Sequence, residues 1–139
     1  MRKPRILVIG SSNTDLTVAL PRIPRPGETI LGGTFMTGAG GKVANQAVAA
    51  ARCGGEVNFV ARVGRDALAK EAIAGFNQAG INTRFIVRDA QHPSGVALIF
   101  GAADGQNSIG VASGANGFLS PADFRWRASP FRQERMRRW

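Results

Sequence analysis

Residues 38–52 read GAGGKVANQAVAAAR, a cluster of glycines followed at once by an alanine-rich run. This pattern predicts a helix over residues 41–52, with Gly54 standing where a helix-ending glycine belongs. The small alanine side chains would let the helix lie close against a sheet. The apolar positions that recur at helical spacing and share one face are Val43, Ala47, Val48 and Ala51.

Buried strands are predicted on both sides of this helix. Residues 5–10 form a continuous apolar run that ends in glycine, and residues 57–63 form a second buried run. A second helix follows, capped by Asp66 and stopped by Gly80, and a third strand covers residues 83–87. Strands alternating with helices in this order predict a parallel sheet with right-handed crossovers, which is an α/β fold.

Two exposed extended pieces predict a small antiparallel flap attached to that sheet. Residues 14–20 and 29–37 are extended pieces separated by a proline-rich connection. Residues 95–100 and 108–112 are two further strands, joined by a hairpin-like turn over residues 103–107.

Composition excludes several classes of protein. The chain has 139 residues, enough for one domain, and its 44% hydrophobic and 19% charged residues are typical of a folded globular protein. No apolar run reaches the roughly 18 residues of a membrane-spanning helix, and the N-terminus has no signal-peptide core. A single cysteine, Cys53, can form neither an internal disulfide nor a zinc cluster. These features predict a cytoplasmic protein that does not act on a membrane.

The net charge of +9 is concentrated near the C-terminus. Residues 124–139 hold six arginines and one acid, Glu134, together with both tryptophans. Arginines interleaved with aromatic residues are compatible with binding to nucleic acid or an anionic membrane. We favour the alternative, a basic disordered tail from an altered reading frame, because no nucleic-acid-binding fold accompanies it. Residues 1–123 are then the folded unit.

The glycine cluster lies at the edge where open α/β folds bind ligands, beyond the carboxyl ends of the strands. It fits neither the dinucleotide-binding fingerprint nor the phosphate-binding P-loop, since Val43 stands where the first needs glycine and the second a hydroxyl. Glycines at a helix start let backbone N–H groups approach a ligand oxygen, and Asn45 adds a donor and an acceptor. The alternative is a tight turn before a packed helix.

Asn13 and Asp15 follow the first strand. Because they are two apart in an extended segment, their side chains share one face. A carboxylate beside an amide suits the paired hydroxyls of a polyol, since the carboxylate accepts hydrogen bonds and the amide both donates and accepts. The alternative is an Asx turn that ends the strand.

Taken in order, the motifs resemble those of the ribokinase-like carbohydrate kinases, the PfkB family. The resemblance implies a partial Rossmann-like αβα sandwich with a small β-sheet lid, whose strands lie in residues 12–40 and 94–112. It also implies a homodimer formed by pairing of two lids. The resemblance runs from about residue 6 to residue 123 and rests on GSSNTD (10–15), PGET (26–29), GGKVANQAVAAA (40–51), GRD (64–66), SGVALI (94–99) and GAN (114–116).

The resemblance further implies an activity. The γ-phosphoryl group of ATP would be transferred to the 5-hydroxyl of D-ribose, giving D-ribose 5-phosphate, with Mg²⁺ and a monovalent cation such as K⁺. Asn13 and Asp15 would hold sugar hydroxyls, and Gly40 and Gly41 would form the hinge of the lid. The other sugar-binding positions that the resemblance implies are Gly41, Lys42 and Asn45 at the helix start, and Ala97, Ile99 and Val111 on the lid strands.

Two departures from the family pattern bear on function. Val43 replaces a glycine beside the hinge, and a β-branched residue resists positive φ. The Gly-Ala-Gly-Asp motif, which in this family accompanies the catalytic aspartate and the anion hole of the C-terminal half, is absent. We therefore expect a truncated chain with no catalytic or metal-binding residues, which binds no cofactor and is inactive alone. The alternative is a non-catalytic sugar-binding or lid-dimerisation module.

Two other reactive side chains are expected to be structural. His92 precedes a proline in a turn and is predicted to be solvated, whereas Cys53 ends an apolar helix and is predicted to pack. Neither has a catalytic partner in a recognisable motif.

Overall fold

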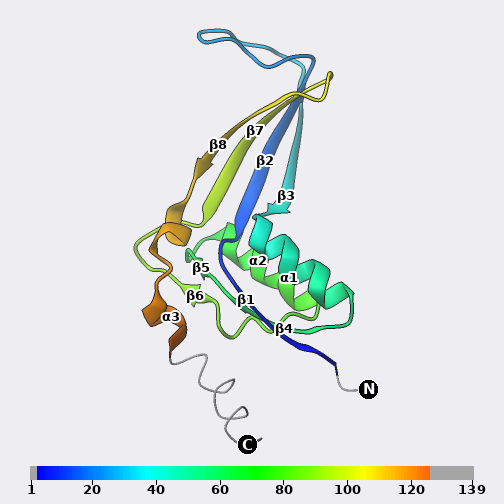
Figure 1. Ribbon diagram of the computed structural model, residues 1–139. Coiled ribbons are helices and arrows are strands. Elements are labelled where there is room, and N and C mark those ends of the chain that lie inside the picture. The colour runs from blue at the N-terminus through cyan, green and yellow to red at the C-terminus, as the bar shows by residue number, and fades with distance from the viewer. Residues whose placement is uncertain (1–2, 126–139) are drawn as a thin grey trace, which may run out of the picture.

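The structure is a computed structural model that describes residues 3–125. An α/β body carries a four-stranded sheet, the lid, which stands away from it (Figure 1). In chain order the elements are β1 (Arg5–Ile9), β2 (Asn13–Leu20), β3 (Thr34–Gly40), α1 (Lys42–Arg52), β4 (Glu56–Val60), β5 (Arg62–Val63), α2 (Ala67–Gln78), β6 (Val87–Arg88), β7 (Gly95–Ala102), β8 (Asn107–Ala112), the 3-10 helix η1 (Gly114–Phe118) and α3 (Pro121–Arg125).

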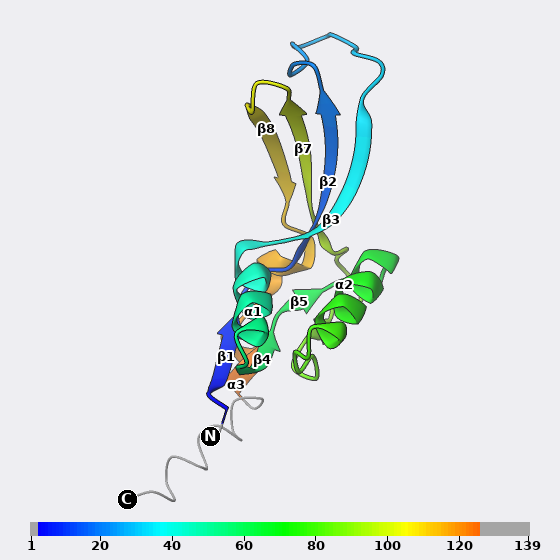
Figure 2. The ribbon, with the colours of Figure 1, turned by 90° about the vertical axis from the view of Figure 1, so that its right-hand side faces the viewer.

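The body consists of parallel strand pairs covered by α1 and α2, which lie side by side below the lid (Figures 1 and 2). β1 pairs with β4, and β5 pairs with β6, in each case parallel, as predicted. In the core, the rings of Phe59 and Phe76 meet edge to face with centroids 5.2 Å apart. Ala44 and Ala47 on α1 are buried in the same core, which confirms the predicted close approach of this alanine-rich helix to the sheet.

The prediction of one continuous strand over residues 57–63 is wrong, because the chain changes its pairing partner at Ala61. Residues 56–60 pair with β1, whereas the carbonyl of Ala61 accepts a hydrogen bond from Val87 N at 2.8 Å and leads into β5. The segment is therefore two short strands, each with a different neighbour.

The predicted strand over residues 83–87 is also wrong, since only Val87 and Arg88 are extended. The chain before them turns: Asn82 Oδ1 accepts from Arg84 N at 3.2 Å, and Ile86 N donates to the carbonyl of Thr83 at 3.0 Å. A side chain that satisfies a nearby backbone group in this way competes with strand pairing.

The helices begin and end at the predicted signals. Gly54 and Gly80 follow α1 and α2 with φ values of +88° and +75°, a conformation in which glycine meets no steric penalty. The Asp66 carboxylate caps α2 by accepting from Ala69 N at 2.9 Å. Within residues 3–125, no helix has the length and apolar character needed to cross a membrane.

The antiparallel flap predicted from residues 14–20 and 29–37 is confirmed by the pairing of β2 with β3, but the lid also contains β7 and β8. Its strand order is β3-β2-β7-β8, and the central pair, β2 and β7, is parallel. Both central strands leave the body in the same direction, with Asn13 opposite Gly95, and each is then followed by an antiparallel return strand. The lid is thus two hairpins lying side by side (Figure 2).

The first hairpin returns later than predicted, because β3 begins at Thr34 and not at Thr29. Pairing with β2 starts at Ala19 and Thr34, and it runs on to Asn13 and Gly40. The residues before Thr34 belong to the connection at the far end of the lid, where Gly32 has a φ of +84°.

The register of the strands sorts the lid side chains onto two faces. Asp15 lies beside Gly38 and Ala97, and Ala97 lies beside Val111. We call this side the Asp15 face; its members are Asn13, Asp15, Thr17, Met36, Gly38, Ala97, Ile99, Ile109 and Val111. The opposite side is the Leu98 face; its members are Thr14, Leu16, Val18, Phe35, Thr37, Val96, Leu98 and Phe100.

Asp66 joins α2 to the segment before β7 as well as capping the helix. Its carboxylate accepts from both the backbone N and the hydroxyl of Ser94, each at 2.7 Å. Burial raises the pKa of Asp66, but the hydrogen bonds from Ser94 and Ala69 outweigh burial, so the pKa lies below the ordinary value for aspartate.

Replacing Asp66 with alanine is expected to lower the free energy of unfolding by about 1–3 kcal/mol at pH 7, because the cap is lost and buried Ser94 loses its acceptor. Since the folded pKa is below the unfolded value of about 4, this stabilisation is complete above that value and is lost as pH falls through the folded pKa. Urea unfolding at pH 7 and pH 3 should show the difference between the two proteins narrowing. Asp104→Ala, in the exposed turn between β7 and β8, is the control, and an equal loss there would contradict the assignment.

Candidate functional site

The candidate site lies where the lid joins the body, on the Asp15 face. Asn13 and Asp15 are both in β2 and share this face, as the sequence predicts. The Asp15 carboxylate lies directly over Gly40, so that a Cβ atom at position 40 would collide with it. Glycine at the predicted hinge therefore makes room for the carboxylate.

The start of α1 is held against the same strand. Gly41 has a φ of +96°, and a Cβ there would stand 3.0 Å from the carbonyl oxygen of Ser11 and 3.1 Å from Asn13 N. Lys42 and Asn45, on the first turn of α1, are both exposed. This close approach brings Gly41, Lys42 and Asn45 to the base of β2.

Val43 lies within α1, so the residue is helical and needs no positive φ. Its side chain packs over Gly10, at the end of β1: a Cβ at position 10 would be 2.7 Å from each of the two Val43 methyl groups. The valine that departs from the family pattern thus fastens the first turn of α1 to β1.

The predicted apolar positions complete the Asp15 face. Ala97 is 5% exposed and lies between Asp15 and Val111 in the sheet, and Ile99 is the next residue of β7 on this side. Val111 is 58% exposed. The structure therefore brings Asn13, Asp15 and the three apolar residues onto one surface, beside the first turn of α1.

Sequence reasoning did not assign a role to Asn116, which the structure places at this junction. Asn116 Oδ1 accepts from Ser12 N at 2.9 Å, and Asn116 Nδ2 donates to the carbonyl of Ser12 at 3.0 Å and to Asn13 Oδ1 at 2.8 Å. The GAN motif at 114–116 draws attention to Asn116 in the sequence. It does not reveal the hydrogen bond to Asn13, because the two residues are 103 positions apart.

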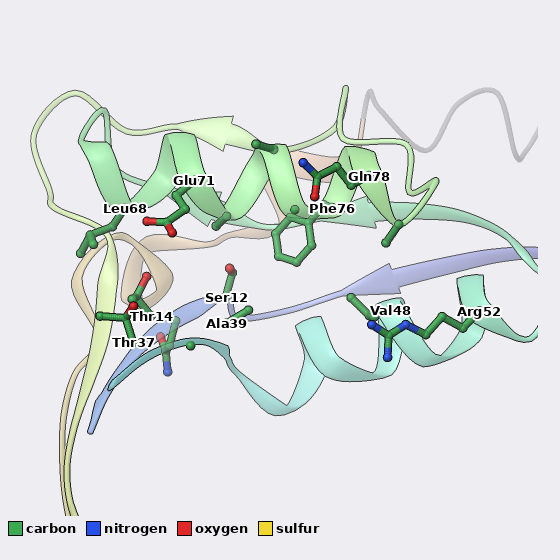
Figure 3. Close-up of a pocket in the computed structure, with 16 residues that line it drawn as sticks. Ser12, Thr14, Thr37, Ala39, Val48, Arg52, Leu68, Glu71, Phe76 and Gln78 are labelled. Carbon is green, nitrogen blue, oxygen red and sulfur yellow. The ribbon is translucent and has the colours of Figure 1, made fainter. Parts of the chain in front are cut away.

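A separate cleft of about 540 Å³ lies between α1 and α2 and reaches the base of the lid (Figure 3). Val48 and Arg52 of α1 lie across the cleft from Phe76 and Gln78 of α2 (Figure 3). Glu71 lies at the other end of the cleft, on the side of Thr14 and Thr37 (Figure 3). Of the predicted site residues, only Asn13 lines the cleft. The candidate site is therefore not this cleft but the opposite, Asp15 face of the lid.

The prediction that His92 is solvated is wrong. Its Nδ1 lies 3.2 Å from Asp89 Oδ2, and its ring stacks on Phe118 with centroids 3.6 Å apart. Asp89 has a side chain only 2% exposed and also accepts from Arg62 Nε at 2.7 Å. Hydrogen bonds from the Gln91 backbone and from Arg62 hold the pKa of Asp89 well below its usual range.

This cluster also holds α3. Arg62 Nη1 donates to Asp123 Oδ1 at 3.0 Å, and the other Asp123 oxygen accepts from Ser120 N at 2.9 Å. Hydrogen bonding to Asp89 raises the pKa of Arg62. The network is structural, since it ties β5 to the start of α3.

Cys53 is exposed, so the prediction that it packs in the core is wrong. It is the C-cap residue of α1, where the helix end meets solvent. Among residues 3–125, no group of three or more His, Cys, Asp or Glu side chains is placed to hold a metal ion. The predicted tail falls almost entirely on residues 126–139, outside the described residues.

An α/β body with a sheet lid, and polar groups gathered at their junction, is the architecture that the sequence predicts for a carbohydrate kinase. Residues 3–137 match the family model of the pfkB family carbohydrate kinases. The chain is 44% identical over 120 residues to the ribokinase of Haemophilus influenzae, which covers 86% of this chain and 39% of that protein. It is also 44% identical over 118 residues to the deoxyribokinase of Salmonella typhi, with coverages of 85% and 39%.

A solved structure of the Arabidopsis thaliana ribokinase, complexed with ribose and ATP, matches with a TM-score of 0.72 and 39% identity, over 84% of this chain and 38% of that one. The chain therefore belongs to the pfkB family of carbohydrate kinases, and its fold is that of the ribokinases, as predicted. It spans about two fifths of the length of the curated relatives that it matches.

Gly41→Ala is expected to lower the free energy of unfolding by about 1–3 kcal/mol, because alanine resists the positive φ and would press on the Ser11 carbonyl. Gly38→Ala is the matched control, since a Cβ at position 38 meets nothing within 4 Å and its φ is not positive. Denaturant unfolding of both variants tests the contact. Equal stability of the two variants would show that the junction does not need glycine at 41.

Proposed function

We propose that this chain supplies the sugar-binding surface of a ribokinase-type enzyme, which transfers the γ-phosphoryl group of ATP to the 5-hydroxyl of D-ribose. The observation that carries the proposal is the convergence of Asn13, Asp15 and the first turn of α1 on one side of the lid base. The structure of the Arabidopsis thaliana ribokinase complexed with ribose and ATP supports the choice of substrates.

Each group has a distinct chemical part in this proposal. The Asp15 carboxylate accepts hydrogen bonds from sugar hydroxyls, and the Asn13 amide lies two residues away on the same face. The backbone N–H groups of the first turn of α1, from Gly41 on, have no carbonyl partner within the helix, and their dipole favours an oxygen-rich ligand. Lys42 and Asn45 add an ammonium and an amide at the exposed rim.

The apolar residues of the Asp15 face would cover the sugar ring. Ala97, Ile99 and Val111 present aliphatic groups along the lid above the polar cluster. Excluding water in this way strengthens the hydrogen bonds beneath and keeps the phosphoryl group from hydrolysis. Gly40, the last residue of β3, and Gly41, the residue before α1, are the proposed hinge on which the lid closes.

In the proposed reaction the 5-oxygen of the sugar forms a bond to the γ-phosphorus of ATP, the bond from that phosphorus to the bridging oxygen breaks, and ADP leaves. The hydroxyl proton passes to a base that we do not assign to this chain. Mg²⁺ and K⁺ are expected from the family resemblance, and we assign no residue of this chain to them; residues 3–125 contain no cluster of three or more His, Cys, Asp or Glu side chains that could hold a metal ion. The part proposed here is positioning of the sugar.

A second candidate is a module that binds sugar or pairs lids without catalysis. The Leu98 face favours it, because Leu98 is 52% exposed and Phe35 and Phe100 on the same side are 63% and 41% exposed. Apolar side chains gathered on one side of a sheet are a typical interaction surface. We propose that two copies of the chain pair through this face, whichever of the two functions holds.

Titration calorimetry of the 139-residue chain with D-ribose tests the sugar site. Asp15→Asn is expected to weaken binding by about 10- to 100-fold, because a hydrogen bond to a charged acceptor is lost. Asp104→Asn makes the same chemical change at the exposed β7–β8 turn and should bind as the parent does. Absence of heat from the parent would refute the site. With ATP added, we expect no phosphoryl transfer, and robust turnover would show that a base is present in the chain.

Sedimentation velocity tests the proposed pairing of lids. Leu98→Lys places a charge in the centre of the Leu98 face and should convert the dimer to a monomer, since an unpaired charge in an interface is costly. Ile109→Lys is the matched control, because Ile109 is 53% exposed but lies on the Asp15 face. A parent chain that is monomeric at all concentrations, or equal effects of the two variants, would contradict the proposal.

A further inference from the structure

We propose that Asn116 is a positioning residue that fixes the orientation of the Asn13 amide, so that its NH₂ group and not its carbonyl is offered to the sugar. The inference rests on the proposed function, because it concerns the same sugar site. It adds a residue from η1, beyond the lid, and a defined polarity for one hydrogen bond to the substrate.

The orientation of Asn116 is set by backbone groups, whose polarity cannot change. Ser12 N can only donate, and it points to Asn116 Oδ1 at 2.9 Å. The carbonyl of Ser12 can only accept, and it lies 3.0 Å from Asn116 Nδ2. Rotating the Asn116 amide by half a turn would break both hydrogen bonds, so only one orientation is compatible with the loop.

The orientation of Asn13 follows from that of Asn116. Asn116 Nδ2 uses its second hydrogen to donate to Asn13 Oδ1 at 2.8 Å, so the carbonyl of Asn13 is committed to this contact. The Asn13 NH₂ group makes no recorded hydrogen bond within residues 3–125, and Asn13 is only partly buried. The contact therefore turns the carbonyl of Asn13 toward Asn116 and leaves its NH₂ group as a free donor on the face that carries the Asp15 carboxylate.

The residue next to the contact between Asn13 and Asn116 is a glycine, Gly95. A Cβ at Gly95 would collide with both Asn13 Oδ1 and Asn116 Nδ2, and it would stand 2.9 Å from the carbonyl of Ser113. Gly95 therefore leaves the space in which the two amides meet. Because η1 follows β8 and Ser12 precedes β2, the contact also joins the bases of the two lid hairpins.

A donor and an acceptor side by side define the substrate group that fits. One sugar oxygen must accept from Asn13, and a neighbouring hydroxyl must donate to Asp15. Two adjacent hydroxyls satisfy both requirements, and a sugar that lacks either one leaves a polar group at the lid base without a partner. The geometry thus selects a vicinal diol.

Asn116→Asp is the direct test, because it keeps the shape and reverses one polar group. The new carboxylate still accepts from Ser12 N, but it now faces Ser12 O and Asn13 Oδ1 with an acceptor. We expect the Asn13 amide to rotate and present its carbonyl to the sugar, lowering D-ribose affinity at pH 8 about tenfold in calorimetry. Asn107→Asp, at an exposed position of β8, adds the same charge and should bind like the parent.

Lowering the pH provides a readout that loss of packing would not produce. Once protonated, the introduced carboxyl accepts from Ser12 N and can donate its single O–H to Asn13 Oδ1, which restores the contact that orients Asn13 but not the hydrogen bond to the Ser12 carbonyl. The two acceptor oxygens that it faces should raise the pKa of this carboxyl above the ordinary value of about 4, so the ratio of variant to parent affinity should return toward one as the pH is lowered from 8 to 4. Using the ratio removes the effect of groups that titrate in both proteins. A ratio of one at pH 8, or a reduced ratio that does not change with pH, would overturn the inference.

Asn13→Asp covers the case in which Asn116→Asp unfolds, as judged by circular dichroism. It keeps an acceptor for Asn116 Nδ2 but offers oxygen in place of the NH₂ group, so ribose affinity should fall at least tenfold. Unchanged affinity would refute the inference. If the parent does not bind ribose, or binds it independently of Asp15, the proposed function fails and this inference fails with it. If binding depends on Asp15 but not on the polarity at 13 and 116, only this inference fails.

Discussion

The close approach of the Gly40–Gly41 segment to the backbone of residues 11–13 is the constraint on which the rest of the site depends. At this contact a Cβ atom on Gly41, at the start of α1, would stand only about 3 Å from the backbone of residues 11–13. The Asp15 carboxylate then lies over Gly40, and Val43 packs over Gly10. In each contact a side chain packs over a glycine, which has no side chain of its own. The polar groups of β2 and α1 therefore lie close together. A helix start two or three ångströms further away would separate them.

The body and the lid are stabilised in different ways. The body closes a core of buried alanine, valine and phenylalanine between sheet and helices, in which Phe59 and Phe76 are the largest members. The lid has no comparable core, since large apolar residues on both of its faces, such as Leu98 and Ile109, are about half exposed. A sheet that is half exposed on both faces is stabilised when other groups pack against those faces. In the proposed function, the Asp15 face covers the sugar and the Leu98 face pairs with a second copy of the chain.

Local signals predicted the elements better than they predicted their partners. The glycine stops, the Asp66 cap and the shared face of Asn13 and Asp15 are properties of a few neighbouring residues, and each is found where the sequence indicates. The change of partner at Ala61, the parallel pairing of β2 with β7 and the contacts of His92 depend on residues far away in the chain, which periodicity does not report. Asn116 shows the same limit within the site: its motif was visible, but its three hydrogen bonds to Ser12 and Asn13 require the folded junction.

The parallel centre of the lid has a consequence for how the chain is made. β2 leaves the ribosome early, but its neighbour β7 begins at Gly95, and the amide that clamps both hairpins lies 103 positions beyond Asn13. Such distant pairings carry a large loop-closure entropy and form slowly. The segments of the body that lie between β3 and β7 are therefore synthesised before β7. During that time the hairpin of β2 and β3 has an unpaired edge on β2. Nascent chains stalled before Gly95 would display that edge to chaperones, whereas chains in which β7 has left the ribosome would cover it.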